Sequence, residues 1–147
     1  MARTTRTATT VWIGPTGRER GELLVGSDAF PALPLSRSAP RDGPDGLTSP
    51  GELLAGAHSV SLAMAVSAGL TAAGHPAEHV RVDAACEVDE AADGEHRIAR
   101  MSLTVSAIVT SIDEDEFNRI VDAAALTCPI SQALRRNVEL DIDQQLE

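Results

Sequence analysis

Apolar and polar residues alternate from Val80 to Val88 and again from Met101 to Val109. A period of two places successive side chains on opposite faces of a strand. The dipeptide Asp93-Gly94 between the two segments is a strong turn signal. We therefore predict two half-buried antiparallel strands, each with one face toward a core. The residues predicted to face inward are Val80, Val82, Ala84, Cys86 and Val88 of the first strand, and Met101, Leu103, Val105, Ala107 and Val109 of the second.

A long helix is predicted from Pro50 to about Ala73. Ser49 can cap its start, proline is tolerated in a first turn, and Gly74 can end the helix. The segment from Leu53 onward contains no Asp, Glu, Lys or Arg and is long enough to span a bilayer. Serine, threonine, histidine and glycine residues dilute its apolar character, however. We interpret it as the buried central helix of a soluble protein.

A second helix is predicted to begin after Asp113, which with Glu116 resembles a capping box. Cys128-Pro129 interrupts that helix, and a short helix follows to about Arg136. The apolar face of the second helix carries Phe117, Ile120, Val121 and Ala124, and a last strand carries Val138, Leu140 and Ile142.

The N-terminal part is predicted to form a hairpin. Thr5 to Gly14 and Gly21 to Gly26 would be its strands, and residues 28–50 would be a loop broken by five prolines. The resulting order, β-β-α-β-β-α-α-β, is typical of an α+β fold. We predict one domain covering residues 1–147, without internal repeats.

Composition narrows the classes of partner and compartment. Hydrophobic residues make up 43% of the 147, so the chain can form a sizeable core. A net charge of −10 opposes binding to phosphate backbones, so nucleic acid is not an expected partner. Two cysteines are too few for a disulfide-stapled secreted domain, and the first residues lack a signal peptide. We expect a cytoplasmic protein with no membrane partner.

Two segments carry a resemblance to a known family. Residues 48–65 read TSPGELLAGAHSVSLAMA, and residues 126–134 read LTCPISQAL. In that order they resemble the OsmC/Ohr family of organic-hydroperoxide-reducing stress proteins, and the predicted element order is similar to the family architecture over nearly the whole chain. The resemblance implies an OsmC-like fold, with two main helices on an antiparallel sheet. It also implies an intertwined homodimer with two sites at the subunit interface.

The resemblance also implies which residues form the site. The family places a peroxidatic cysteine three residues after the histidine position, where this chain has Ser61, and a resolving cysteine before proline, here Cys128. An arginine and a glutamate flank the reactive cysteine in the family. The matching positions are Arg37, for which Arg41 could substitute, and Glu52. The implied partners are an organic hydroperoxide and a dithiol reductant, and no cofactor or metal is expected.

Three explanations of Ser61 remain open: an engineered exchange of cysteine, a natural divergence, and a serine nucleophile with new chemistry. The neighbours Val60 and Leu62 also depart from the family pattern, which favours natural divergence. A serine nucleophile is disfavoured because the chain lacks a Gly-x-Ser-x-Gly elbow, although His58 lies one helical turn away. On this interpretation Ser61 bonds a backbone carbonyl and His58 is a hydrogen-bonded core residue.

The two cysteines receive different interpretations. Cys128 precedes a helix-opening proline, a setting that lowers a thiol pKa, but a free cysteine is also often a small buried hydrophobe. Cys86 falls on the apolar face of a predicted strand and is interpreted as core packing.

Two functional hypotheses follow from these residues. The first is an OsmC/Ohr stress protein whose peroxidase activity is lost or strongly reduced by Ser61. The alternative is a non-catalytic binding module that holds an apolar small molecule at the dimer interface.

Overall fold

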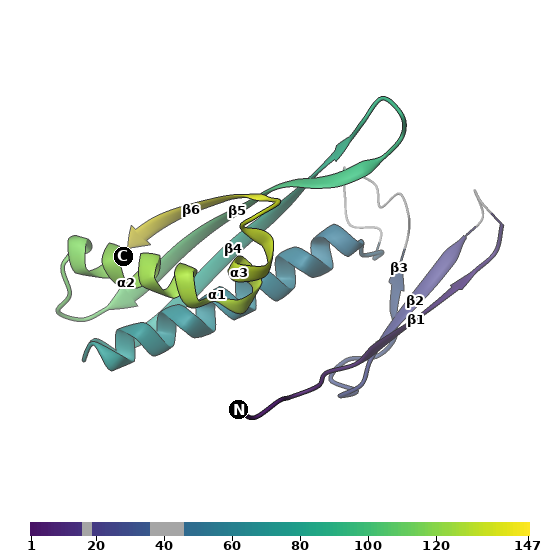
Figure 1. The fold of residues 1–147 in the computed structure, drawn as a ribbon. Coiled ribbons are helices and arrows are strands. Elements are labelled where there is room, and N and C mark those ends of the chain that lie inside the picture. The colour runs from purple at the N-terminus through teal and green to yellow at the C-terminus, as the bar shows by residue number, and fades with distance from the viewer. Residues whose placement is uncertain (16–18, 36–45) are drawn as a thin grey trace. The chain divides into compact units, whose positions relative to one another are not determined.

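A computed structural model describes residues 1–15, 19–35 and 46–147. The predicted site arginines Arg37 and Arg41 therefore lie outside the described residues. The chain divides into two compact units, Met1–Pro50 and Gly51–Glu147, and each unit is described by itself. Figure 1 labels the helices and strands of both units.

The first unit contains a three-stranded antiparallel sheet in the order β1-β2-β3. Its strands are β1 (Ala8–Ile13), β2 (Arg20–Val25) and β3 (Leu33–Leu35). The predicted hairpin is confirmed as β1 and β2, with Trp12 opposite Gly21. The short strand β3 lies in a segment that was predicted to be loop. Pro34 cannot donate to a ladder, and its place in a three-residue edge strand agrees with that restriction.

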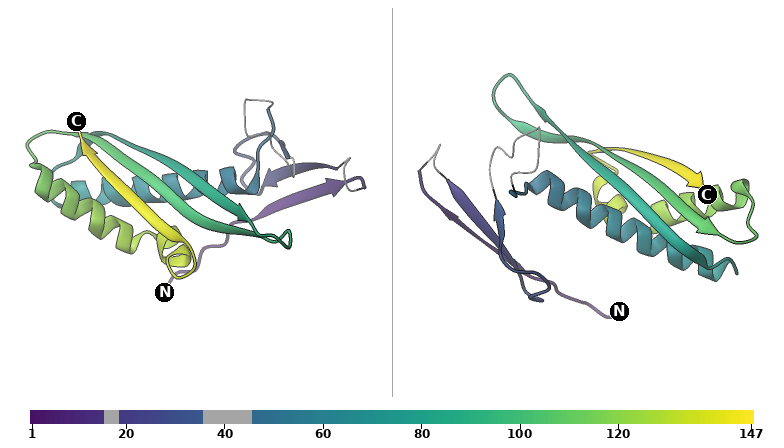
Figure 2. Two further views of the ribbon diagram at one scale, coloured as in Figure 1. Left: turned by 90° about the horizontal axis from the view of Figure 1, so that it is seen from above. Right: turned by 180° about the vertical axis from the view of Figure 1, so that it is seen from behind.

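The second unit contains helices and a three-stranded sheet in the order β4-β5-β6. In the views of Figure 2, the two long helices lie side by side along one face of this sheet. The unit therefore has the two-layer α+β arrangement that the sequence predicts. Its elements are α1 (Pro50–Ala72), β4 (Ala77–Glu90), β5 (His96–Val109), α2 (Glu114–Thr127), α3 (Pro129–Leu134) and β6 (Glu139–Leu146).

The sheet of the second unit is mixed, whereas a wholly antiparallel sheet was expected. Strands β4 and β5 pair antiparallel, as predicted for a hairpin. Strand β6 pairs parallel to β5, with Arg100 opposite Glu139 and Ala107 opposite Leu146. Strand β6 is parallel to β5 because α2 and α3 connect the two strands and return the chain to the end where β5 starts. Alternation along β6 identifies a strand without giving its direction.

The core of the second unit lies between the sheet and the helices. Phe117 of α2 is fully buried there, and it is the only one of the chain's three aromatic residues in the core, since Trp12 and Phe30 are exposed. A Cβ added at Gly69 would lie 3.0 Å from Ile120 Cγ2, so glycine permits the close packing of α1 against α2. The predicted inward positions are confirmed in the core by Met101, Leu103, Val105 and Ala107 of β5 and by Phe117, Val121 and Ala124 of α2.

Helix α1 begins and ends as its sequence predicts. It starts at Pro50, and Gly74 follows its last turn with φ +86°, the left-handed conformation that glycine adopts readily. By length and composition α1 is the one described helix that could cross a membrane. One face of it belongs to the core, through Ala55, His58, Leu62, Val66 and Leu70.

The opposite face of α1 is apolar but exposed within this chain. Val60 and Met64 are 60% and 69% exposed, and Gly56, Ala57 and Ala68 are also on the surface. We expected a helix that is buried on all sides. Residues of the same chain bury only one side of α1.

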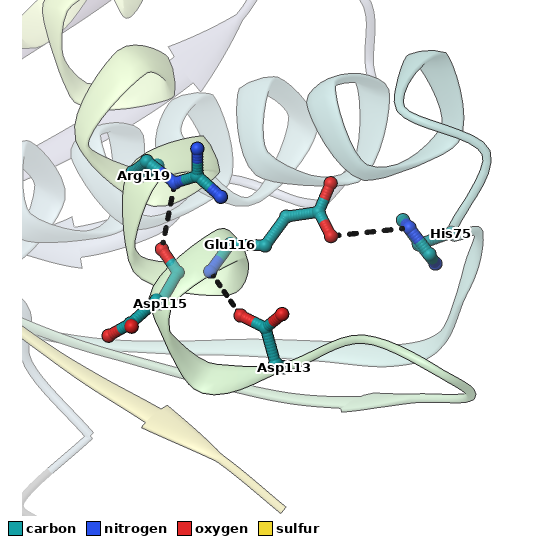
Figure 3. Close-up of polar contacts among 5 residues, drawn as sticks. All are labelled: His75, Asp113, Asp115, Glu116 and Arg119. Carbon is teal, nitrogen blue, oxygen red and sulfur yellow. Dashed lines mark hydrogen bonds and ion pairs between the residues drawn. The ribbon is translucent and has the colours of Figure 1, made fainter.

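Helix α2 starts with half of the predicted capping box. The Asp113 side chain accepts a hydrogen bond of 2.8 Å from the Glu116 backbone N–H, and this contact is drawn in Figure 3. The Glu116 carboxylate does not complete the box but lies 3.6 Å from His75 Nε2, just beyond the end of α1. The start of α2 is thereby linked to the turn after α1.

Candidate functional site

The structure brings Ser61 and Cys128 into direct contact. Ser61 lies on α1, and Cys128 lies between α2 and α3. Ser61 Oγ is 3.1 Å from Cys128 Sγ, although the residues are 67 positions apart in the chain. The two positions that the resemblance assigns to a pair of thiols are therefore adjacent in space.

The local backbone explains why Cys128 points inward. Proline disfavours the helical conformation of the residue before it, and Cys128 has φ −58° and ψ 120°, outside the helical region. Its N–H donates to the Ala124 carbonyl at 2.8 Å, and its carbonyl accepts from the Gln132 N–H at 2.9 Å. The backbone of Cys128 thus makes one hydrogen bond with the end of α2 and one with the start of α3. Its side chain is fully buried.

The surroundings of Cys128 lower the pKa of its thiol. Burial raises the pKa of Cys128, but hydrogen bonding from the Ser131 N–H, the Ser61 and Ser131 hydroxyls and the Ile130 N–H outweighs burial, so the pKa is lowered. The Cys128 side chain does not accept a regular cap hydrogen bond at the start of α3. The interpretation of Cys128 as a merely buried hydrophobe therefore accounts for its burial but not for these donors.

His58 stands behind this site. It is fully buried, and its Nε2 lies 2.8 Å from Ser131 Oγ. Burial lowers the pKa of His58, so the ring is neutral near pH 7. Its Nδ1 is buried and has no hydrogen-bond partner within the described part of the chain. His58 is thus a hydrogen-bonded core histidine, and its partner Ser131 lies three residues after Cys128.

Glu52 is not brought to Ser61 within this chain. It lies in the exposed first turn of α1, nine positions before Ser61. Nine positions in a helix correspond to about 13 Å along the axis and about two and a half turns, so the two residues lie on opposite sides. Arg37 and Arg41 belong to the residues that are not described.

Cys86 is separate from this site. It lies opposite Met101 in the β4–β5 ladder and packs against the core, and burial raises its pKa. In the first turn of α1, a Cβ added at Gly51 would lie 3.5 Å from Cys86 Sγ. These contacts agree with its interpretation as core packing.

A cavity of about 360 Å³ also lies in the second unit, but neither Ser61 nor Cys128 lines it. It is polar, and its two arginines are engaged by carboxylates: Arg97 lies 3.4 Å from Asp89, and Arg100 lies 3.1 Å from Glu139. It does not resemble an apolar ligand site. Its lining residues are Glu87, Asp89, Arg97, Ile98, Ala99, Arg100, Asn137 and Glu139.

A family model described as OsmC-like protein matches residues 43–143, which is more than half of the chain and includes both site segments. The chain belongs to the OsmC-like protein family. The match spans α1, where Ser61 lies, and the junction of α2 and α3, where Cys128 lies. The resemblance inferred from the sequence is therefore confirmed.

Individual OsmC-like proteins cover almost the full length of this chain. Peroxiredoxin OsmC from Escherichia coli is 29% identical over 130 residues, 88% of this chain and 90% of the relative. The crystal structure of an OsmC-like protein from Mycoplasma pneumoniae has a TM-score of 0.78 at 14% identity, covering 99% of each chain. The organic hydroperoxide resistance protein OsmC from Legionella pneumophila has a TM-score of 0.71 at 20% identity, again over 99% of each chain. These likenesses establish the OsmC-like fold.

Ser131 is the residue that our sequence analysis did not select for this OsmC-like site. A signal for it was present, because Ser131 lies three residues after Cys128, in the first turn of the helix that Pro129 opens. Cys128 makes no side-chain cap hydrogen bond in that turn, but the Ser131 N–H is among the groups that lower its pKa. The partnership with His58 carried no comparable signal, since 73 positions separate the two residues.

Proposed function

We propose that this chain is an OsmC-family protein of the organic-hydroperoxide stress response in which two-thiol peroxide reduction is lost or strongly reduced. One observation carries the proposal: Ser61 Oγ stands 3.1 Å from Cys128 Sγ. The two positions of a dithiol site are in contact, and only one of them holds sulfur.

The chemistry explains why one missing sulfur has a large effect. In two-thiol reduction a thiolate attacks the O–O bond of the hydroperoxide, an S–O bond forms, and the leaving alkoxide takes a proton to become an alcohol. A second thiolate then attacks the oxidised sulfur, giving a disulfide and releasing the oxygen as water. The side chain of Ser61 contains no sulfur, so it can neither attack as a thiolate nor form a disulfide. Cys128 retains its thiol but is fully buried.

A peroxide-consumption assay with an organic hydroperoxide and a dithiol reductant tests this proposal. We expect the chain as it stands to turn over at the background rate and Ser61→Cys to exceed it by on the order of 100-fold or more, because the variant restores the nucleophile. Ser59→Cys is the matched control, since it adds a thiol two positions away on α1, where the native hydroxyl bonds the Gly56 carbonyl. Rapid turnover by the unaltered chain would contradict the proposal.

We also propose that the chain works as a homodimer in the cytoplasm. The exposed apolar face of α1, with Val60 and Met64 at its centre, supports a second copy as the covering partner. Glu52 lies on the opposite side of α1 from Ser61, which agrees with a site that takes its glutamate from a second copy of the chain. Both features support a site shared between protomers.

The dimer is tested by light scattering coupled to size-exclusion chromatography. We expect the mass of two chains for the native sequence and the mass of one chain for Met64→Glu, which places a charge on the exposed face of α1. Ala85→Glu adds the same charge at an exposed position of β4 and is expected to remain dimeric. A monomeric native protein at micromolar concentration would exclude this interface.

A further inference from the structure

The C-terminal end of helix α2 is held by side chains from beyond that helix. An α-helix leaves its last carbonyl groups without N–H partners of its own, and Pro129, which opens α3, has no N–H to donate. The Leu126 carbonyl, in the last turn of α2, instead accepts from Arg135 Nη2 at 2.8 Å and from Gln132 Nε2 at 3.1 Å. Two side chains that follow the corner between α2 and α3 therefore meet at one carbonyl that precedes it.

Arg135 also supplies a charge that α2 itself lacks. The carbonyl end of a helix carries a partial negative charge, which a nearby cation stabilises. The last turn of α2 contains no basic residue. The Arg135 guanidinium lies at that end of α2, at hydrogen-bond distance from its carbonyl partner. The contact is therefore favoured by charge as well as by hydrogen bonding.

These contacts span the residue that carries the sulfur of the site. Cys128 lies in the chain between the Leu126 carbonyl and the two donors to it. Gln132 bonds this corner twice, because its backbone N–H also donates to the Cys128 carbonyl at 2.9 Å. The Arg135 N–H donates to the Ser131 carbonyl at 3.0 Å, which anchors Arg135 in α3. A change in the angle between α2 and α3 would have to break some of these bonds.

We propose that Arg135 and Gln132 are positioning residues for Cys128. By bonding the end of α2 they fix the corner between α2 and α3, and that corner holds Cys128 Sγ at 3.1 Å from Ser61 Oγ on α1. The inference rests on the proposed function, in which positions 61 and 128 form the site. Both residues act through the backbone of the corner rather than on the sulfur itself.

The placement of the two site positions can be measured separately from stability. In Ser61→Cys, the equilibrium between dithiol and disulfide depends on how closely the folded protein holds the two sulfur atoms. A contact that only stabilises the fold contributes equally to both forms and leaves this equilibrium unchanged. A contact that fixes the corner favours the disulfide, because its loss lets Cys128 move away from α1.

The test is the equilibrium of Ser61→Cys with reduced and oxidised glutathione, in the full chain with Cys86→Ala so that positions 61 and 128 carry its only thiols. The two protein thiols are oxidised to a disulfide while oxidised glutathione is reduced to two thiols. We expect Arg135→Met to lower the equilibrium constant for the protein disulfide by about 5-fold, the factor that corresponds to one net hydrogen bond. Gln132→Leu removes the longer and uncharged bond and should lower it by about 2-fold.

Two further variants make this result specific. Arg136→Met removes the neighbouring exposed arginine, which has no hydrogen-bond or ion-pair partner within the described part of the chain, and should leave the constant unchanged. Arg135→Lys keeps a cationic donor on a long side chain and should retain most of the parent value. An unchanged constant in Arg135→Met, or an equal loss in Arg136→Met, would overturn the inference.

Amide hydrogen exchange with Ser61 unaltered covers the case in which the disulfide does not form. The N–H groups of Cys128 and Gln132 are both hydrogen-bonded at the corner, and we expect Arg135→Met to accelerate the exchange of both by about 5-fold. The Phe117 N–H bonds a carbonyl at the other end of α2 and should exchange at the native rate. Native exchange at Cys128 in this variant would contradict the positioning role. Neither readout involves peroxide turnover, so failure of the proposed function and failure of this inference are distinguished.

Discussion

Oxidised Ser61→Cys is expected to contain a disulfide between positions 61 and 128. Ser61 Oγ and Cys128 Sγ are 3.1 Å apart, and a disulfide needs its sulfur atoms at about 2.05 Å, so an approach of about 1 Å suffices. The longer carbon–sulfur bond supplies part of that approach. Wild-type Cys86 and Cys128 are both free, so the new thiol has an available partner in Cys128.

The disulfide should change stability as well as connectivity. It closes a loop between residues 67 positions apart, and loop-closure entropy for that length corresponds to about 4 kcal/mol of stabilisation. Denaturant unfolding of the oxidised and reduced variant measures the difference, and thiol titration should count one free thiol after oxidation, that of Cys86. This gain in stability is separate from any gain in turnover.

Two controls make this result specific. Ser59→Cys should keep all three thiols under the same oxidant, because its side chain bonds the Gly56 carbonyl rather than facing Cys128. Ser61→Cys combined with Cys128→Ala should gain no oxidant-dependent stability. Failure of Ser61→Cys to form the disulfide in a folded protein would mean that α1 and the start of α3 do not meet as described.

Phe117→Ala is expected to cost about 3–5 kcal/mol of unfolding free energy. Phe117 is fully buried between α2 and the sheet, and no other aromatic residue of the chain is in the core. The other residues of the core cluster are aliphatic or contain sulfur, and loss of the ring leaves a cavity among them. For a domain whose total stability is about 5–15 kcal/mol, the loss is large enough to threaten folding at 37 °C.

Leu126→Ala is the matched control for Phe117→Ala. It truncates a large apolar residue on the same helix, but its side chain is 62% exposed. A surface truncation of this kind should change the unfolding free energy by no more than about 0.5 kcal/mol. Urea unfolding at one fixed protein concentration measures both variants, and equal losses would contradict the assignment of Phe117 to the core.

Several elements could be predicted because their signals are local. Pro50 and Gly74 delimit α1 through the conformations that their own backbones permit. The alternation around Asp93-Gly94 identifies β4 and β5, and the turn between them makes the two strands antiparallel. The register shifts within their ladder, one of them between Glu87 and Val88, carry no such signal. Strand β3 escaped prediction because three residues around Pro34 show no alternation and are ordered by pairing with β2.

Some residues near the candidate site could likewise be found from the sequence, and others could not. The sequence alone singled out Ser61 and Cys128 by resemblance, which implies that one thiol of a pair is replaced by serine. It also placed Cys128 beside Pro129, at the start of a helix. It did not identify Ser131 as a neighbour of these residues. The assignment of Glu52 to the site stays a prediction, because Glu52 and Ser61 lie on opposite sides of α1 within one chain.

By itself, then, the sequence determined the family, the helices and most of the strands, because each depends on residues close together in the chain. It also has serine at position 61, where the resemblance implies a cysteine. Only the tertiary structure decided the parallel direction of β6, the contact of Ser61 with Cys128 and the bond between His58 and Ser131. These contacts of about 3 Å join residues that are far apart in sequence. They depend on how α1, α2 and α3 pack together, and no local preference of the backbone specifies that packing.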